Sequence, residues 1–275
     1  MYPFVSLPTL LDPHKCLTAC FGSEYEFGGR VSARANLGKC CGGWGENCLI
    51  EETACTVFSA LREKAVYLVF QGTTSLHQLK HEFESFNMMV QLPPSCGGGR
   101  VSLYYWNAFQ RLWEGGLAVK LSRIVSRYPN FELRIMGHSM GGALAALAAS
   151  FMAHQNLIVR GTRLGRRIRL YTFGAVHSGD RRWALELKKA VPDSFRVNNR
   201  WDIAPQMARS VNREYYHHGT EVWYNSLMLK GHSFRECSDG QSTFCSAVVH
   251  PLLWNWIDHL FYFGTFVLSS CQLCT

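Results

Sequence analysis

A serine between two glycines is the feature of this 275-residue chain that most directly indicates chemistry. Ser139 lies in the run GHSMGG, after the largely apolar FELRIM and before the alanine-rich ALAALAA. A strand that turns sharply into a helix at such a serine holds the hydroxyl exposed, where it can attack a carbonyl carbon. Gly137 and Gly141 allow strand and helix to approach closely at the turn. The N–H group of Met140, at the helix start, is then placed to stabilise a developing oxyanion.

The surroundings of this pattern decide its meaning, because three fixed small residues often occur together by chance. An apolar run before Ser139 and a small-residue helix after it form the context in which a nucleophilic serine is expected. One residue does not fit. Arg134 interrupts a strand that should be hydrophobic throughout if it is central and parallel.

The elements that must position this serine resemble those of the fungal-type (class 3) lipases, a family of α/β-hydrolases. Five motifs carry the resemblance in chain order: AVYLVFQGTT at 65–74, GHSMGGALA at 137–145, RLYTFGAV at 169–176, FRVNNRWDIAPQM at 195–207 and DHLFYFG at 258–264. YYHHGTEVWY at 215–224 and CSDG at 237–240 look closest to the secreted roundworm branch. The resemblance implies an α/β fold with a mostly parallel central sheet, flanking helices and a lid helix.

A catalytic triad follows from the resemblance, residue by residue. Ser139 is the nucleophile, Asp202 the orienting acid and His259 the general base, in the chain order that this fold requires. The serine needs an imidazole to take its proton and a carboxylate to orient the ring. Asp202 could instead be a turn-forming residue before Pro205, and His259 an ordinary histidine of an aromatic segment.

Other histidines compete with His259 for the role of base. His250 is the serious rival, because it lies in the same C-terminal region, although it lacks the aromatic surroundings of His259. His217 and His218 follow a tyrosine pair and lie beyond the segment 195–207 that contains Asp202. His77 and His81 have the spacing of two zinc ligands on one helix turn, but no third ligand is apparent, so we expect neither a metal nor a cofactor.

The resemblance also places a second oxyanion donor, the backbone N–H of Thr73, at the end of the strand predicted over residues 65–70. Thr73 and Met140 would then form the oxyanion hole together. Gln71 stands where the family usually has arginine, and Ala175 and Val176 stand where proline is common. The change at Gln71 calls the rigidity of this loop into question more than its chemistry.

Residues 75–90 are predicted to form the lid. Five apolar residues fall on one helical face, and Glu82 lies among the polar residues that fall largely elsewhere. Such a helix can cover an acyl groove in water and turn its apolar face to lipid. The alternative is a surface helix whose apolar stripe packs on the core. The stripe, which includes the expected substrate-binding residues, consists of Leu76, Leu79, Phe83, Phe86 and Val90.

Length and composition favour one large domain over residues 1–275. The resemblance implies that this is an α/β-hydrolase domain, with residues 1–60 as a cysteine-rich N-terminal cover and residues 75–95 around the lid. A helix is predicted over residues 107–128, ended by Pro129. The net charge of +8 suggests at most attraction to anionic lipid surfaces, and no nucleic-acid motif occurs. The apolar stretch 254–268 is too short and too interrupted for a transmembrane segment.

Eleven cysteines, crowded toward the ends of the chain, indicate an oxidising compartment and disulfides that clamp the termini. We therefore expect a secreted protein. Residues 1–15 contain three prolines and no basic start, so they do not resemble a signal peptide, and a missing or removed leader is inferred.

Two classes of function remain open from the sequence. The first is a secreted serine carboxylester hydrolase, a triacylglycerol lipase, acting through an acyl-enzyme on lipid esters at a lipid–water interface. Within that class, a phospholipase or a feruloyl-type esterase is an alternative, because lid and loops rather than the triad select the substrate. The second class is a catalytically inactive relative that binds lipid or protein. The intact Ser139, Asp202 and His259 favour the enzyme.

Overall fold

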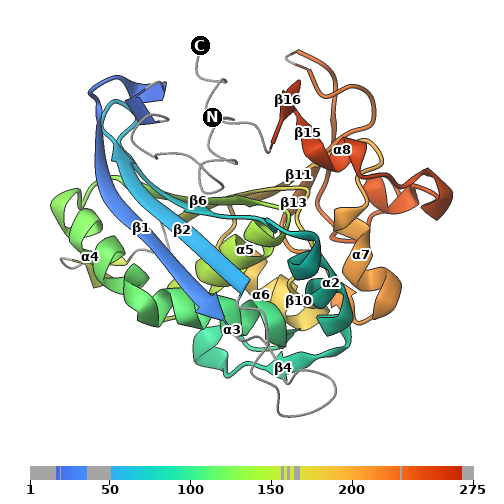
Figure 1. Cartoon of the computed structure of the whole chain (residues 1–275), viewed down its shortest axis with the longest axis horizontal. Helices are drawn as coiled ribbons and strands as arrows, with labels where there is room; N and C mark the ends of the chain where they lie inside the picture. The colour runs from blue at the N-terminus through green and yellow to red at the C-terminus, as the bar shows by residue number, and fades with distance from the viewer. Residues whose placement is uncertain are drawn as a thin grey trace.

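The chain is built around an eight-stranded sheet (Figure 1). The computed structural model describes residues 17–18, 20–35, 51–155, 158–159, 162–163, 168–229 and 231–267. The strand order is β1-β2-β3-β6-β9-β11-β13-β14. These strands are β1 Tyr25–Ala35, β2 Glu51–Ala60, β3 Ala65–Phe70, β6 Glu132–His138, β9 Ile168–Phe173, β11 Ser194–Asn199, β13 Thr220–Tyr224 and β14 Arg235–Cys237.

The centre of the sheet is parallel. Neighbouring strands from β3 through β6, β9 and β11 to β13 all run in the same direction. Strands β1 and β2 add an antiparallel pair at one edge, and β14 adds an antiparallel strand at the other. The predicted α/β-hydrolase fold is thus confirmed. The N-terminal region differs from the expected cover, because residues 25–35 and 51–60 are strands of the main sheet itself.

Helices cover the sheet, and α5 packs most closely on its centre. In Figure 1, α2, α7 and α8 gather at one side of the molecule and α4 lies at the opposite side. The helices are α2 Leu76–Glu84, α3 Leu103–Leu112, α4 Ala118–Arg127, α5 Met140–His154, α6 Arg181–Ala190, α7 Ala204–Val211 and α8 Ile257–Leu260. A second small sheet combines β4 Met89–Gln91, β5 Arg100–Ser102, β10 Gly179–Asp180 and β12 Tyr215–Tyr216; the pairs β7 Ile158–Val159 with β8 Thr162–Arg163 and β15 Phe261–Tyr262 with β16 Thr265–Phe266 complete the strands.

Strand β3 shows why the sheet is buried on both faces. Its side chains alternate, so that Val66, Leu68 and Phe70 join the core under α5 while Tyr67 and Val69 join the opposite core. All six residues of the strand are buried. The continuous hydrophobic run AVYLVF is therefore the pattern expected of a central strand covered on both sides.

Arg134 of β6, which the sequence left unexplained, belongs to a charged cluster at the N-terminal end of the parallel strands. Its guanidinium pairs with Glu63 and Glu132, and it lies over the ring of Tyr67 at 5.4 Å from the centroid. The side chain is only 11% exposed. Its charge is tolerated there because two carboxylates and one aromatic face surround it.

The crossover before Ser139 is not the single helix predicted over residues 107–128. Helix α3 begins at Leu103, and a π-helical segment, Trp113–Leu117, separates it from α4. Within that segment Gly116 has φ 115°, which is outside the helical region and favours glycine. The crossover therefore consists of two helices joined by a kink. None of the helices in the described ranges is long and apolar enough to span a membrane.

Candidate active site

The turn at Ser139 is the tight strand-to-helix junction that its glycines predicted. Ser139 has φ 58° and ψ −129°, a left-handed conformation that a serine rarely adopts. Its amide N–H donates to the carbonyl of Phe173 at 2.9 Å, which ties the turn to β9. A Cβ atom at Gly137 or Gly141 would collide with backbone atoms of the facing element. The strained turn is therefore held between β3, β6 and α5.

The structure brings Ser139, His259 and Asp202 into one hydrogen-bonded line. His259 Nε2 lies 2.9 Å from Ser139 Oγ, and His259 Nδ1 lies 2.9 Å and 3.0 Å from the two carboxylate oxygens of Asp202. All three residues are more than nine-tenths buried. Ser139 follows β6, Asp202 follows β11, and His259 lies on the short helix α8, so three separate segments supply the three groups. This is the geometry of a serine, a general base and an orienting acid.

Asp202 has an additional partner that the sequence did not indicate. The hydroxyl of Tyr262 donates to Asp202 Oδ2 at 2.5 Å, and the N–H of Ala204 donates to Oδ1 at 2.8 Å. Burial alone would raise the pKa of Asp202, but the attraction of His259 and the hydrogen bonds from His259 and Tyr262 outweigh it and lower the pKa. The carboxylate therefore stays ionised. A tyrosine three residues after the candidate base was the only sequence signal for this contact.

His138, the residue before the candidate nucleophile, supports His259. Its ring stacks on the His259 ring with centroids 4.4 Å apart, and its Nε2 lies 2.9 Å from the His259 carbonyl oxygen. Because a carbonyl only accepts, Nε2 carries the proton. Burial, with a smaller contribution from the charge of His259, lowers the pKa of His138 to about 3. The ring is therefore a neutral support rather than a second base.

Asp258 holds the segment before His259 in place. Its carboxylate accepts from the N–H of Trp201 at 3.2 Å and from the side chain of Asn255 at 2.9 Å. Arg200 lies 3.6 Å away and forms an ion pair with it. The segment that contains Asp202 and the segment that contains His259 are thus joined to each other as well as to the sheet.

The expected oxyanion donors lie on two neighbouring elements. Met140 is the first residue of α5, and Thr73 follows β3 in a loop that passes close to the turn. A Cβ atom at Gly72 would be 2.9 Å from the His138 carbonyl oxygen and 3.6 Å from Ser139 Cβ. Only glycine permits this approach. It puts the loop of Thr73 beside Ser139, where two N–H groups could bind one oxyanion.

Helix α2 fastens this loop through two polar residues, one of which, Glu82, the sequence placed among the residues largely off the apolar stripe. Glu82 is 1% exposed, and it accepts hydrogen bonds from Thr73 Oγ1 at 2.8 Å and from Tyr105 at 2.5 Å. Gln78 is also buried, accepts from the N–H of Thr74 at 2.9 Å, and lies 3.6 Å from the Met140 sulfur. Two polar residues of α2, Gln78 and Glu82, thus lie on its buried face.

Gln71, the departure from the arginine of the family pattern, has a compensating partner. Its side-chain oxygen accepts from the guanidinium of Arg30 in β1 at 3.0 Å, and Gln71 is 3% exposed. A guanidinium is therefore still present beside the loop, although another strand supplies it.

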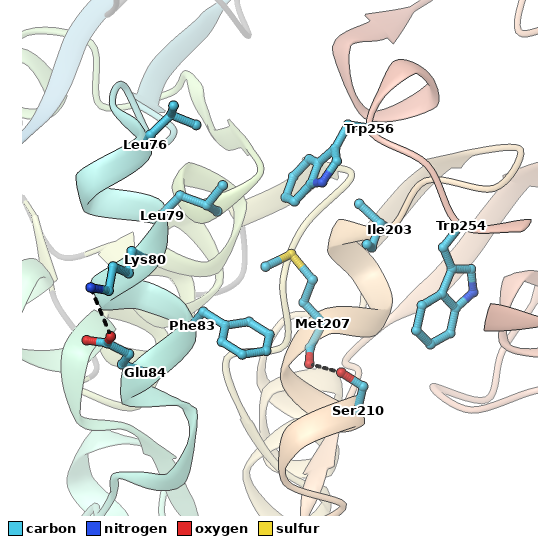
Figure 2. Close-up of a pocket in the computed structure, with 10 residues that line it drawn as sticks. All are labelled: Leu76, Leu79, Lys80, Phe83, Glu84, Ile203, Met207, Ser210, Trp254 and Trp256. Atoms are coloured by element: carbon cyan, nitrogen blue, oxygen red, sulfur yellow. Dashed lines mark hydrogen bonds and ion pairs between the residues drawn. The ribbon is translucent and has the colours of Figure 1, made fainter. Parts of the chain in front are cut away.

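An open apolar groove of about 400 Å³ lies between α2 and the C-terminal segment (Figure 2). Leu76, Leu79 and Phe83 form one wall, and Phe83 points across the groove toward Met207 of α7. Trp254 and Trp256 complete the opposite wall. The Trp256 ring lies edge-on to the His259 ring with centroids 5.6 Å apart, so one lining residue of the groove contacts the triad.

The predicted lid helix is shorter than expected. Helix α2 ends at Glu84, a 3-10 helix covers Ser85–Asn87, and Val90 belongs to strand β4. Phe86 is fully buried in the core, where it contacts Tyr215, so it does not line the groove as we had predicted. Leu76 is 86% exposed and Phe83 47% exposed. The apolar stripe is therefore divided between a groove wall and the core.

The rival histidines lie away from Ser139. His250 is exposed, and its ring accepts from the N–H of Leu252 at 3.3 Å as the cap of a 3-10 helix. His77 and His81 contact each other on α2, with ring centroids 4.1 Å apart. Among the described residues, no group of three or more histidine, cysteine or acidic side chains could hold a metal ion.

His217 and His218 are buried next to His177, and this cluster makes stability sensitive to acid. The His217 and His177 rings stack at 3.5 Å, and the backbone carbonyl of His218 accepts from the buried Arg196 at 2.5 Å. Burial, followed by neighbouring positive charges that include Arg196, lowers the pKa of all three, for His218 to about 3. Glu221, which pairs with Arg196, and Arg209 also lie near the cluster, and Asp239, Arg181 and Lys188 line a pocket with His217. Folding thus requires neutral rings.

We expect these histidines to contribute fully to the free energy of unfolding above about pH 6.5, which is the histidine pKa of the unfolded chain. The free energy of unfolding should fall as the pH drops below that value. Each such histidine contributes a loss of about 1.4 kcal/mol per pH unit in this window. Urea unfolding at pH 8, 6.5 and 5 measures the slope. His218→Gln should reduce the number of protons taken up on unfolding by one; a flat profile between pH 7 and 5 would contradict the prediction.

One disulfide lies among the described residues with both of its cysteines placed. Cys237 of β14 is bonded to Cys245, with Cα atoms 6.3 Å apart. Cys20 also takes part in a disulfide, while Cys55 and Cys96 carry free thiols. The terminal cysteines of the predicted clamp, Cys16, Cys40, Cys41, Cys48, Cys271 and Cys274, lie outside the described residues.

A mostly parallel sheet with a serine at the strand-to-helix turn, followed in sequence by a carboxylate and a histidine that bond to it in line, defines an α/β-hydrolase with a serine-type site. The sequence profile of the family described as Lipase (class 3) matches residues 67–212, more than half of the chain. The chain belongs to the class 3 lipase family.

Its relatives include lipases of a roundworm and of fungi. A lipase of Caenorhabditis elegans is 28% identical over 194 residues, which cover 63% of this chain and 52% of that protein. A lipase of Rhizomucor miehei is 28% identical over 229 residues, covering 82% and 58%. The chain thus spans a little over half the length of these two relatives. Secreted mono- and diacylglycerol lipase A of Penicillium cyclopium is 25% identical over 78% of the chain and 67% of the relative.

Solved structures of fungal lipases share the fold. The Rhizomucor miehei lipase in its propeptide complex has a TM-score of 0.68 and 26% identity, covering 81% of this chain and 67% of that one. The lipase of Rhizopus microsporus var. chinensis has a TM-score of 0.73 at 20% identity, covering 96% and 80%.

Proposed function

We propose that this protein is a serine carboxylester hydrolase of the lipase type, which cleaves long-chain glycerol esters at a lipid–water interface. The observation that carries the proposal is the line of hydrogen bonds from Ser139 through His259 to Asp202, beside an apolar groove. Membership of the class 3 lipase family supports it. The disulfide and the secreted relatives support an extracellular location.

The reaction begins with attack of Ser139 Oγ on the ester carbonyl carbon, while His259 Nε2 takes the hydroxyl proton. The oxygen becomes negative and is bound by the N–H groups of Met140 and Thr73. When the carbonyl reforms, the ester C–O bond breaks and His259 returns the proton to the departing alkoxide. Water then attacks the acyl carbon while His259 takes its proton. The bond from the acyl carbon to Ser139 Oγ breaks, His259 returns the proton to Ser139 Oγ, and the fatty acid leaves.

Asp202 supports His259 in both half-reactions, the acylation of Ser139 and the hydrolysis of the acyl-enzyme. It holds the imidazole with Nδ1 protonated, so that Nε2 is free to accept, and stabilises the imidazolium that forms. Tyr262 and the N–H of Ala204 keep the carboxylate in that orientation.

The composition of the groove favours an ester with a long acyl chain over an ester of a short acid. Its walls are formed mainly by leucine, phenylalanine, methionine and tryptophan, with Lys80 and Glu84 paired at 3.7 Å at one end. An apolar chain in this groove would remove apolar surface from water on both sides. The occupied groove would also place the carbonyl near His259, since Trp256 contacts both.

A panel of four substrates tests the function. We expect the highest turnover with emulsified long-chain triacylglycerol, lower turnover with a soluble short-chain ester, and least with phospholipid and feruloyl esters. A preference for phospholipid or feruloyl ester would reassign the substrate class. If no ester is hydrolysed, the chain is an inactive binding relative.

Phe83 on α2 and Phe86 just after it provide a matched pair of variants that test whether α2 acts as a lid. Phe83→Ser should lower activity on emulsified long-chain ester about tenfold and leave the soluble-ester activity and the melting temperature nearly unchanged, because Phe83 is half exposed. Phe86→Ser removes a fully buried ring, so it should cost roughly 3 to 5 kcal/mol and lower all three measurements together. A parallel loss in the Phe83 variant would assign that residue to the core rather than the lid.

A further inference from the structure

The segment of residues 244–257, which follows β14 and ends at the first residue of α8, is anchored at both ends. Cys245 is bonded to Cys237, and the N–H of Ser246 donates to the buried carboxylate of Glu221 at 3.2 Å. At the other end, the N–H of Asn255 donates to the carbonyl of Trp201 at 3.0 Å, next to Asp202. The backbone of this segment is therefore fixed to the sheet rather than free to fold over its own side chains.

Apolar side chains nevertheless project from this segment into solvent. Leu252 is 89% exposed, Ile257 69% and Phe244 77%, and Val248 and Leu253 are each about half exposed. Single exposed leucines are common on protein surfaces. Five large apolar residues within fourteen positions of one anchored segment are not, and such a surface is typical of contact with a partner or a membrane.

The position of this segment beside the groove indicates what the partner is. Trp254 and Trp256 of the same segment line the groove, and Leu76 and Phe83 face them from α2 (Figure 2). Exposed apolar side chains thus stand on both rims of an apolar channel. A lipid layer covering both rims would let an acyl chain enter the groove without crossing water.

Charge favours an anionic layer. Residues 244–266 contain one acidic residue, Asp258, which is buried and paired with Arg200. Arg200 also lies over the ring of Trp201 at 4.7 Å and keeps partial exposure. Negative charge is therefore absent from the exposed part of this segment, while the whole chain carries +8. Such a balance attracts anionic lipid head groups.

We propose that residues 244–257 form a fixed docking surface for an anionic phospholipid layer, which attaches the protein to lipid independently of α2. The proposal rests on the proposed function, because it names the surface from which the ester is drawn. Its test measures adsorption rather than hydrolysis, so the two can fail separately.

The experiment measures binding of the Ser139→Ala chain to vesicles, since this variant cannot digest its own target. Vesicles of phosphatidylcholine and phosphatidylserine at about 4:1 are compared with pure phosphatidylcholine by sedimentation. We expect tighter binding to the mixed vesicles, and a loss of roughly 30-fold when Leu252→Ser and Leu253→Ser are added. In the same Ser139→Ala background, Phe83→Ser should leave most of the adsorption in place.

Val119→Ser is the matched control, because Val119 is 62% exposed on α4 at the opposite side of the molecule. It should not change adsorption. The proposal is overturned if Leu252→Ser with Leu253→Ser binds as tightly as its parent, if Val119→Ser loses as much, or if pure phosphatidylcholine binds equally well. Association of the parent chain with itself, abolished by the leucine changes, would instead assign the surface to a second copy.

Discussion

Replacement of Ser139 by alanine is expected to lower ester turnover by at least about 10⁴-fold, because the acyl-enzyme cannot form without the hydroxyl. The fold should be retained, since within the described part of the chain that hydroxyl bonds only to His259, at 2.9 Å. Turnover of a soluble short-chain ester measures the loss, and thermal unfolding measures the stability. A serine-directed phosphonate should label the parent chain at Ser139 and not the variant.

Ser139→Gly is a sharper companion variant. It should be as inactive as Ser139→Ala, but it should unfold at a higher temperature, because φ 58° is strained for alanine and favourable for glycine. Activity that survives in both variants would exclude Ser139 as the nucleophile. Loss of activity together with loss of folding in both would leave the chemical role unproven and point to a structural one.

Replacement of His259 by alanine is the second large effect, and we expect a loss of about 10⁴-fold or more in turnover. The serine would then lack a base, and Asp202 would keep a buried charge without its imidazole partner. Phosphonate labelling of Ser139 should slow in parallel, which distinguishes an unactivated serine from an unfolded protein.

His250→Ala is the control for this prediction. His250 is exposed and makes its ring hydrogen bond to the N–H of Leu252, so the variant should keep turnover within about twofold. If His250→Ala lost activity and His259→Ala kept it, the base would be His250. The histidine segment would then have been aligned with the wrong motif.

The central features of the fold and the candidate site were predictable because they depend on local sequence. The turn at Ser139 needs small residues at fixed positions, and the buried β3 needs a continuous apolar run, so both are visible in the chain. Asp202 and His259 could be placed because each lies in a distinctive segment, and the structure brings both to Ser139.

What the sequence hid are contacts between distant segments. Glu82 looks like an exposed residue of an amphipathic helix, and only the positions of Thr73 and Tyr105 make it a buried acceptor. Tyr262 is one of several aromatic residues near His259. Only the structure shows that its hydroxyl donates a hydrogen bond to Asp202, at 2.5 Å. Phe86 continues the apolar stripe of α2, but the helix ends before it. The strand β2 contains Thr53, Thr56 and Ser59 among its buried residues, which obscured its place in the sheet.

The two buried polar residues of α2 have a thermodynamic consequence. Because Glu82 binds Thr73 and Gln78 binds Thr74, the position of this helix and the position of the oxyanion loop form one equilibrium rather than two. A ligand that favours the seated helix must favour the ordered loop by the same free energy, and the reverse also holds. A transition-state analogue that engages the loop should therefore bind more tightly when lipid contacts Phe83, and lipid should bind more tightly when the analogue is present.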